Sequence, residues 1–183
     1  MDLRDIKEFL VDTSKYIILT VIVLLVFMYI FSLQQVVGVS MKPTLNDGDL
    51  LILNKLHYRF HEVKRNDVLT IRHEDSKYLI KRVIGLPGEK ISYKNNILYI
   101  NNKTYKENIY EEMKTDDFDF SKITSLKEET KNMEKIPDNM YLVLGDNRSN
   151  SLDSREIGLI SKEDILGKSE FVIMPFSDIK KIK

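Results

Sequence analysis

The 183-residue sequence contains no cysteine, and its 28 basic and 28 acidic residues leave no net charge. The absence of cysteine excludes disulfide bonds and thiolate metal sites, and it suits a domain that folds outside the cytoplasm without oxidation. The balanced charge gives no electrostatic reason to expect a nucleic-acid partner. The classes left open are enzymes and binding domains that need neither thiols nor a basic surface.

Histidine is scarce too, and its three positions form no recognisable catalytic or metal-binding pattern. His57 and His61 are four residues apart, but no third metal ligand is indicated. His73 stands beside two acidic residues in a polar stretch. We therefore expect no metal and no cofactor, and a catalytic base would have to come from another residue type.

One apolar stretch stands apart from the rest of the chain. From Tyr16 to Leu33 there are eighteen positions without a charge, and a helix of that length covers about 27 Å, close to the thickness of a hydrocarbon core. A cleaved secretory signal would be shorter and end in a small-x-small site, which residues 32–37 lack. A core helix that is apolar on every face suits so small a domain poorly. We predict a retained transmembrane anchor over residues 16–33.

Basic residues around this stretch predict its orientation. Three of them precede it: Arg4, Lys7 and Lys15. Beyond it Lys42 stands alone until Lys55. Because basic residues are retained on the cytoplasmic side, residues 1–15 are predicted to be cytoplasmic. Residues 34–183 then form an extracytoplasmic domain, attached by a single pass through the plasma membrane.

The outer domain is patterned mainly as short strands. Its apolar runs, bounded by turn residues, predict strands at 49–54, 67–72, 78–85, 90–94, 97–100, 140–144 and 169–174. Asn95-Asn96 and Asn101-Asn102 have the composition of tight turns. The predicted fold class is mainly β, with antiparallel sheets or a partial barrel after one transmembrane helix.

Residues 104–136 differ from their surroundings. They are densely charged, and neither glycine nor proline occurs in them. We interpret this segment as an inserted cap or mobile excursion, with a short helix from Ser125 to Glu134.

A serine is placed conspicuously just after the apolar stretch. The segment reads Gly38-Val39-Ser40-Met41-Lys42-Pro43-Thr44, so Ser40 lies between a glycine and a proline turn. It stands seven positions after Leu33, which limits its distance from the span to about 25 Å. This arrangement indicates a nucleophile displayed close to a bilayer, and serine needs a base to become nucleophilic.

Lys81 is a better candidate for that base than any histidine. Strand alternation places Leu79, Lys81 and Val83 on one face, with Arg82 on the other. Apolar neighbours would desolvate the amine and lower its pKa. Half neutrality at pH ~8 requires a fall of ~2.4 units, or about 3 kcal/mol, which burial can supply. The alternative is a solvated lysine on an edge strand.

A third segment, from Gly145 to Arg155, is dense in polar groups. It contains Asp146, Asn147, Arg148, Ser149, Asn150, Ser151, Asp153, Ser154 and Arg155. An ordinary polar loop would explain a few of them. The alternation of Asp, Arg and Ser favours a hydrogen-bonded scaffold that positions the base.

These motifs follow one another in a fixed order: Ser40-Met41-x-Pro43-Thr44, Lys81-Arg82-Val83-Ile84-Gly85 with Pro87-Gly88-Glu89, and Gly145-Asp146-Asn147-Arg148 with Ser151 and Asp153-Ser154-Arg155. With the N-terminal span, they resemble bacterial type I signal peptidases of the smaller Gram-positive form. The resemblance implies a membrane-bound serine endopeptidase with a largely β fold and a Ser–Lys dyad. Its partners would be membrane lipid and the signal peptides that it removes from exported preproteins.

The resemblance also implies roles for particular residues. Ser40 would be the nucleophile and Lys81 the general base, with Ser151 as the hydroxyl that orients the lysine. The structural pairs would be Arg82 with Asp146 and Arg155 with Asp153. Gly38 replaces a serine that serves as an oxyanion donor in the Gram-negative type. The main oxyanion donor is therefore expected to be the backbone N–H of Ser40.

Two other functions fit parts of the pattern. A self-cleaving repressor with a Ser–Lys pair would carry an Ala-Gly or Cys-Gly cleavage site, and this chain has neither alanine nor cysteine. A membrane-tethered β domain that only binds partners would have lost Ser40 or Lys81, and both are present. The peptidase is the function that the sequence predicts.

Overall fold

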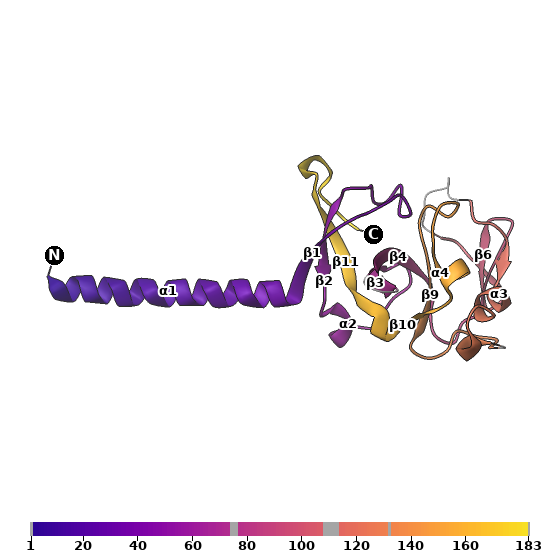
Figure 1. Cartoon of the computed structure of the whole chain (residues 1–183), viewed down its shortest axis with the longest axis horizontal. Helices are drawn as coiled ribbons and strands as arrows, with labels where there is room; N and C mark the ends of the chain where they lie inside the picture. Colours follow the sequence, from indigo (N-terminus) through magenta and orange to yellow (C-terminus); the bar gives the residue numbers. More distant parts are fainter. Residues whose placement is uncertain (1, 74–76, 108–113, 132, 183) are drawn as a thin grey trace.

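A long helix, α1 (Leu3–Ile30), extends from a β domain in the computed structural model, which describes all residues except 1, 74–76, 108–113, 132 and 183 (Figure 1). Lys7–Ile30 is long and apolar enough to cross a membrane, and none of its most apolar part is buried by protein. Large apolar side chains such as Leu25 and Met28 are exposed around it. An apolar surface without protein cover is what a helix in lipid requires.

The helix ends earlier than the predicted anchor at 16–33. Residues Phe31–Gln35 form strand β1, which pairs antiparallel with β2 (Leu50–Asn54) along its whole length. The first four residues, Phe-Ser-Leu-Gln, alternate apolar and polar side chains, and this period suits a strand. The last three residues of the apolar stretch, 31–33, therefore belong to the sheet and not to the helix.

Lys55 fixes the junction between α1 and the sheet. Its backbone N–H donates to the carbonyl of Ile30 at 2.9 Å, and its Nζ donates to the carbonyl of Met28 at 3.0 Å. The last carbonyls of a helix have no partner within it, and a cation there also complements the helix dipole. The end of α1 is thus attached directly to the strand that precedes Lys55.

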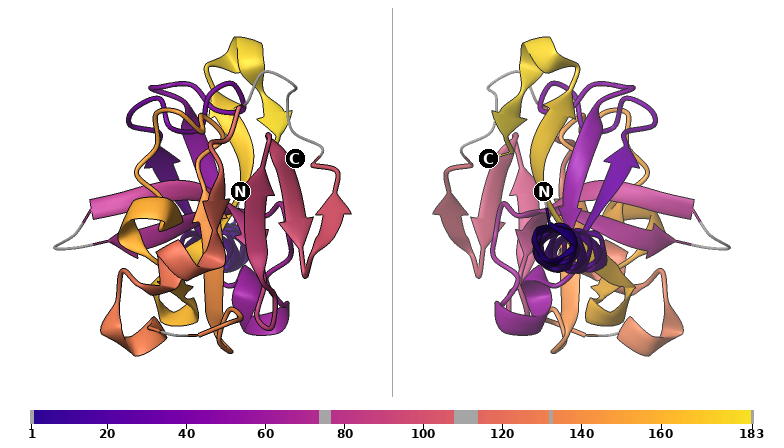
Figure 2. Two further views of the ribbon diagram at one scale, coloured as in Figure 1. Left: turned by 90° about the vertical axis from the view of Figure 1, so that its right-hand side faces the viewer. Right: turned by 90° about the vertical axis from the view of Figure 1, so that its left-hand side faces the viewer.

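Among the described residues the main sheet has eight strands in the order β1-β2-β11-β3-β4-β9-β10, with β12 beside β11. The further strands are β3 (Val68–His73), β4 (Lys77–Gly85), β9 (Met140–Leu144), β10 (Ile160–Ser161), β11 (Ile165–Met174) and β12 (Lys180–Lys181). Their pairs are antiparallel. In the end-on views of Figure 2, β3 and β4 project sideways from the axis of α1.

A second sheet has four strands in the order β7-β6-β5-β8. They are β5 (Ile91–Lys94), β6 (Ile97–Ile100), β7 (Lys103–Tyr105) and β8 (Phe118–Asp119). Asn95 and Asn96 join β5 to β6, and Asn101 and Asn102 join β6 to β7, all four with positive φ. Asparagine tolerates this left-handed backbone better than most residues, and the predicted turns are confirmed. So is the mainly antiparallel β fold class with one preceding apolar helix.

Short helices connect the strands: α2 (His57–Phe60), α3 (Phe120–Thr124), α4 (Ser154–Ile157) and the 3-10 turns η1 (Glu128–Thr130), η2 (Lys162–Asp164) and η3 (Phe176–Asp178). The helix predicted from Ser125 to Glu134 is wrong, because η1 is the only helical segment among the described residues of that range and α3 ends before it. The Asp119 side chain caps α3 by accepting from the Ser121 N–H, which places the helix start earlier than the charge pattern suggested.

The second half of the charged segment is not a mobile excursion. Phe118, Phe120, Ile123 and Ile136 are buried in one hydrophobic cluster with residues of β5, β6 and β9. The charges lie between these apolar positions, so the overall charge density concealed a pattern of core residues. Part of the 104–136 segment, residues 108–113 and 132, lies outside the described residues.

Phe120→Ala tests whether this segment carries core stability. Phe120 is 1% exposed and Leu126 is 45% exposed. Removing the buried ring should lower the free energy of unfolding by about 3–5 kcal/mol, whereas Leu126→Ala should change it by less than about 0.5 kcal/mol. Urea unfolding of the detergent-solubilised chain, followed by circular dichroism, measures both. Equal effects of the two substitutions would contradict the assignment.

Candidate active site

A serine and a lysine meet where the segment after β1 passes over β4. The Nζ atom of Lys81 donates to Ser40 Oγ at 2.8 Å and to the carbonyl of Ile80 at 3.1 Å. Lys81 is 1% exposed, so the alternative of a solvated lysine on a strand edge is wrong. The structure therefore brings together the two residues that the sequence predicts to act as a pair.

Burial lowers the pKa of Lys81 to about 8, and the negative charges of Asp153 and Asp146 oppose part of this shift. The register partner of Lys81 is Leu69, which packs in one apolar cluster with Val83 and the partly buried Leu79. Desolvation disfavours the charged amine, as the alternation of β4 predicts. Near pH 8 a large fraction of the amine is neutral and has a lone pair that can accept a proton.

The backbone around Ser40 is held by Asn147. Its N–H donates to the carbonyl of Ser40 at 2.9 Å, and its side-chain amide donates to the carbonyl of Val39 at 3.1 Å. Gly38 has φ +92°, a conformation that side chains disfavour, and its N–H donates to Asp47 at 2.7 Å. Within the described residues the Ser40 N–H has no acceptor.

Arg82 and Asp146 form the predicted pair directly behind the site. Two parallel hydrogen bonds of 2.7 and 2.6 Å join the guanidinium to the carboxylate, and both side chains are buried. The hydroxyl of Thr44 donates to the same carboxylate. This carboxylate thus connects β4, the serine segment and the loop that begins at Gly145.

Asp153 organises that loop. It accepts from Arg155 at 2.8 and 2.9 Å, as predicted, and also from the backbone N–H of Gly145 at 3.0 Å. Arg155 in turn donates to the carbonyl of Arg148 at 2.6 Å. Because Asp153 is fully buried, its charge-assisted bonds fix the loop without competition from water.

Ser151 lies beside the site but does not make the predicted contact. Its hydroxyl oxygen is buried and has no hydrogen-bond partner among the described residues, so the expected bond to Lys81 is absent from this structure. A Cβ atom on Gly145 would lie 2.1 Å from Ser151 Oγ and 2.6 Å from the carbonyl oxygen of Ser40. Glycine is therefore required at 145, because both serine residues pack against its Cα.

Arg148 supports the active-site loop, a role that the sequence did not predict. Its guanidinium donates to Glu107 at 2.7 Å, to Tyr93 at 2.9 Å and to Thr115 at 2.8 Å. These bonds attach the active-site loop to the second sheet and its charged segment. Glu107 is one of many charges in that segment, so composition alone gave no signal for this contact.

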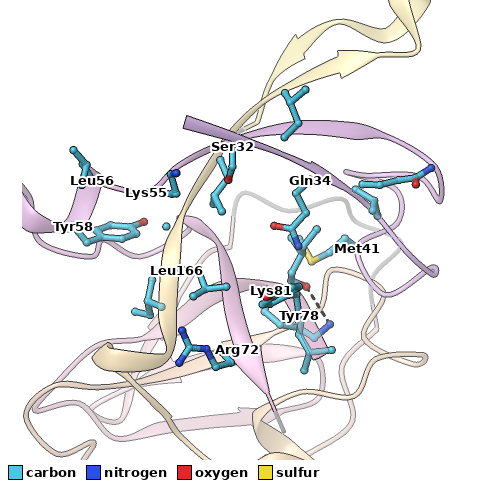
Figure 3. A pocket seen from close by; sticks show the side chains of 18 of the residues that line it. Ser32, Gln34, Met41, Lys55, Leu56, Tyr58, Arg72, Tyr78, Lys81 and Leu166 are labelled. Atoms are coloured by element: carbon cyan, nitrogen blue, oxygen red, sulfur yellow. Dashed lines mark hydrogen bonds between the residues drawn. The ribbon is translucent and has the colours of Figure 1, made fainter. Parts of the chain in front are cut away.

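A groove of about 1020 Å³ contains the Ser40–Lys81 pair (Figure 3). Strands β1 and β4 border it, together with residues near the ends of α1 and β11. Neither border is fully paired within the described part of the chain: β1 ends the sheet order, and β9 pairs with β4 only from Arg82 to Gly85. Free backbone groups therefore lie on opposite sides of the groove.

The fold and the site place the protein among hydrolases, as a peptidase of antiparallel β structure. Residues 9–174 match the family described as signal peptidase, peptidase S26. A signal peptidase I of Bacillus amyloliquefaciens is 36% identical over 97% of this chain and 95% of its own length. Signal peptidase I T of Bacillus subtilis is 38% identical over 94% and 89%. The chain belongs to the signal peptidase family S26.

Among solved structures, a signal peptidase I from Enterococcus faecalis is 31% identical in sequence to this chain. The similarity covers 59% of this chain and 97% of that one, with a TM-score of 0.48.

Lys81→Met should make the protein more stable near neutral pH. The folded pKa of about 8 lies below the ordinary 10.5, so the unfolded chain binds this proton more tightly. The resulting loss of stability is absent above pH ~10.5, grows as the pH falls to ~8, and is complete below it, at up to about 3 kcal/mol. Methionine has no ionisable group and a similar volume, so the substitution removes this loss of stability.

Urea unfolding of the wild-type chain and of Lys81→Met across this pH range measures the effect. The advantage of the variant should be largest at about pH 7 and should shrink between pH ~8 and ~10.5. A difference in stability that does not change with pH would show that the lysine is not buried with a lowered pKa.

Proposed function

We propose that the protein is a membrane-bound serine endopeptidase that removes N-terminal signal peptides from exported preproteins with a Ser40–Lys81 dyad. The observation that carries the proposal is the 2.8 Å hydrogen bond between Lys81 Nζ and Ser40 Oγ, made by a buried amine whose pKa is lowered to about 8. Membership in the signal peptidase family supports the substrate class.

The dyad would act by moving one proton. Neutral Lys81 takes the proton of the Ser40 hydroxyl as Oγ attacks the carbonyl carbon of the scissile bond. The resulting ammonium gives that proton to the departing amine, which leaves an acyl-enzyme. A water molecule then gives a proton to the same lysine as its oxygen attacks the ester. The lysine passes this proton to the departing Ser40 Oγ, and the signal peptide is released.

The negative oxygen formed during attack needs a hydrogen-bond donor. The N–H of Ser40 is available for this, since it has no acceptor among the described residues. Asn147 holds the adjacent carbonyls and so fixes the direction of that N–H. A donor that is oriented before the reaction stabilises the transition state without reorganisation.

The unpaired borders of the groove favour an extended substrate. A peptide entering between β1 and β4 can hydrogen-bond as an added strand, the mode known as β-augmentation. Its alternate side chains would then point toward or away from the groove floor. This mode recognises the backbone first, which suits an enzyme that processes many different preproteins.

The helix α1 supports attachment to the plasma membrane through a single pass. On the distribution of basic residues, residues 1–15 are cytoplasmic and the catalytic domain is extracytoplasmic. Strand β1 begins directly where α1 ends. The groove therefore starts close to the lipid, where the apolar segment of a preprotein would also be held.

Ser40→Ala and Lys81→Met should each abolish cleavage, because each removes half of one catalytic unit. The double variant should be little worse than either single variant. Incubation of the detergent-solubilised full chain with a preprotein, followed by N-terminal sequencing of the product, measures cleavage and its position. Lys94→Met, at an exposed strand residue, is the matched control and should keep full activity. Substantial cleavage by a folded Lys81→Met variant would contradict the assignment of Lys81 as the base.

The rate of cleavage should rise with pH as Lys81 loses its proton. With a folded pKa of about 8, kcat/KM should increase about tenfold per pH unit well below pH 8 and level off above it. Because attack by Ser40 Oγ requires the neutral amine, the rising part of the pH profile reports the deprotonation of Lys81. Stopped assays on one preprotein give the profile. A flat profile across this range would exclude Lys81 as the titrating base.

A further inference from the structure

The groove is lined by four cationic side chains in addition to Lys81. Its other cationic lining residues are Lys55, Arg59, Arg72 and Lys162. Among the lining residues that the structure describes, Glu163 alone is acidic. In Figure 3, Lys55, Leu166 and Arg72 lie on the left of the view, and Lys81 lies on the right, beside Tyr78. We call these four residues the cationic end of the groove.

Protein acceptors do not neutralise this charge. Lys55 binds the carbonyl of Met28, but the side chains of Arg59, Arg72 and Lys162 are exposed and make no hydrogen bond or ion pair in the described part of the chain. Two nearby acids are already occupied: Glu170 lies 3.5 Å from His57, and Asp67 binds Lys168 at 2.5 Å. The cationic end is therefore open to an anionic group from outside.

We infer that the cationic end is a specificity subsite for an acidic side chain of the substrate, on the amino side of the scissile bond. The inference rests on the proposed function, which brings a peptide into the groove. Tyr29, at the end of α1, lines this same groove. A preprotein held in the membrane by its apolar segment would reach Ser40 from that direction, so its residues before the cleavage site would pass the cationic end.

The strand register gives the position of this side chain. Arg72 pairs with Tyr78, three residues before Lys81 on β4. At about 3.3 Å per residue, Arg72 is level with a point about 10 Å along β4 from the backbone of Lys81. An extended substrate covers that distance in about three residues, and the length of the arginine side chain adds further reach. The acidic residue is therefore expected about four to six positions before the scissile bond.

An anionic lipid headgroup is the competing ligand for these cations. Lys55 and Arg59 lie near the end of α1, where lipid would be accessible. Arg72 and Lys162, however, belong to β3 and η2 and line the same groove as Ser40 and Lys81. Cations that share a groove with the nucleophile favour a peptide as the ligand.

The test compares preproteins that differ at a single position. Glu, Gln or Lys is placed in turn at each of the fourth to sixth residues before the cleavage site. The full chain is assayed in phosphatidylcholine vesicles at low salt. At the responsive position kcat/KM should be about fivefold higher for Glu than for Lys, with Gln between them, the size expected of exposed charge pairs. At about 0.5 M salt the difference should largely disappear.

Arg72→Glu should reverse the order, so that the Lys preprotein is cleaved fastest. The matched control is Lys103→Glu, an exposed residue on β7 outside the groove, and it should leave the order unchanged. A charge preference that persists in Arg72→Glu, or that is missing at every position, would overturn the inference.

Phosphatidylglycerol vesicles separate the two ligands. If this lipid raises the cleavage of all three preproteins equally, and Arg72→Glu removes the effect without any charge preference, the site binds lipid and the inference fails. The proposed function is checked independently, by cleavage of the Gln preprotein with the wild-type chain and its loss in Ser40→Ala.

Discussion

The buried amine of Lys81 is the constraint on which the rest of the site depends. An amine in water holds its proton at neutral pH, and only desolvation brings its pKa to about 8. That burial destabilises the fold, so the surrounding structure has to hold the strand and its neighbours firmly. The packing of β3, β4 and β9 around this position is therefore part of the chemistry as well as of the fold.

The remaining charges of the site are arranged so that they do not cancel this effect. Asp146 and Asp153 both attract the ammonium form, but each is bound to an arginine, Arg82 or Arg155. The paired carboxylates fix the loop through directed hydrogen bonds while their net charge is largely compensated. Free carboxylates at the same places would raise the pKa of Lys81, which would leave less of the neutral amine near neutral pH.

The second sheet also contributes to the site. Arg148 leaves the active-site loop and binds Glu107, Tyr93 and Thr115, while Asn147 next to it holds the backbone of Ser40. The charged segment thus has two roles: its apolar residues complete a core, and Glu107 anchors the loop. The smaller sheet thus supports the active site through Arg148, although Ser40 and Lys81 lie on the side of the main sheet.

Local patterns in the sequence determined the apolar helix, most strands, the asparagine turns and the choice of Ser40 and Lys81, since each depends on neighbours along the chain. Tertiary structure alone decided the rest. The end of α1 at Ile30 depends on pairing with β2, and the buried positions among the charges of 104–136 depend on the sheet they pack against. The hydrogen bonds of Arg148 to the second sheet and the cationic end of the groove bring together residues distant in sequence, and no local pattern encodes such contacts. Nor does the sequence reveal that the Ser151 hydroxyl has no hydrogen-bond partner among the described residues.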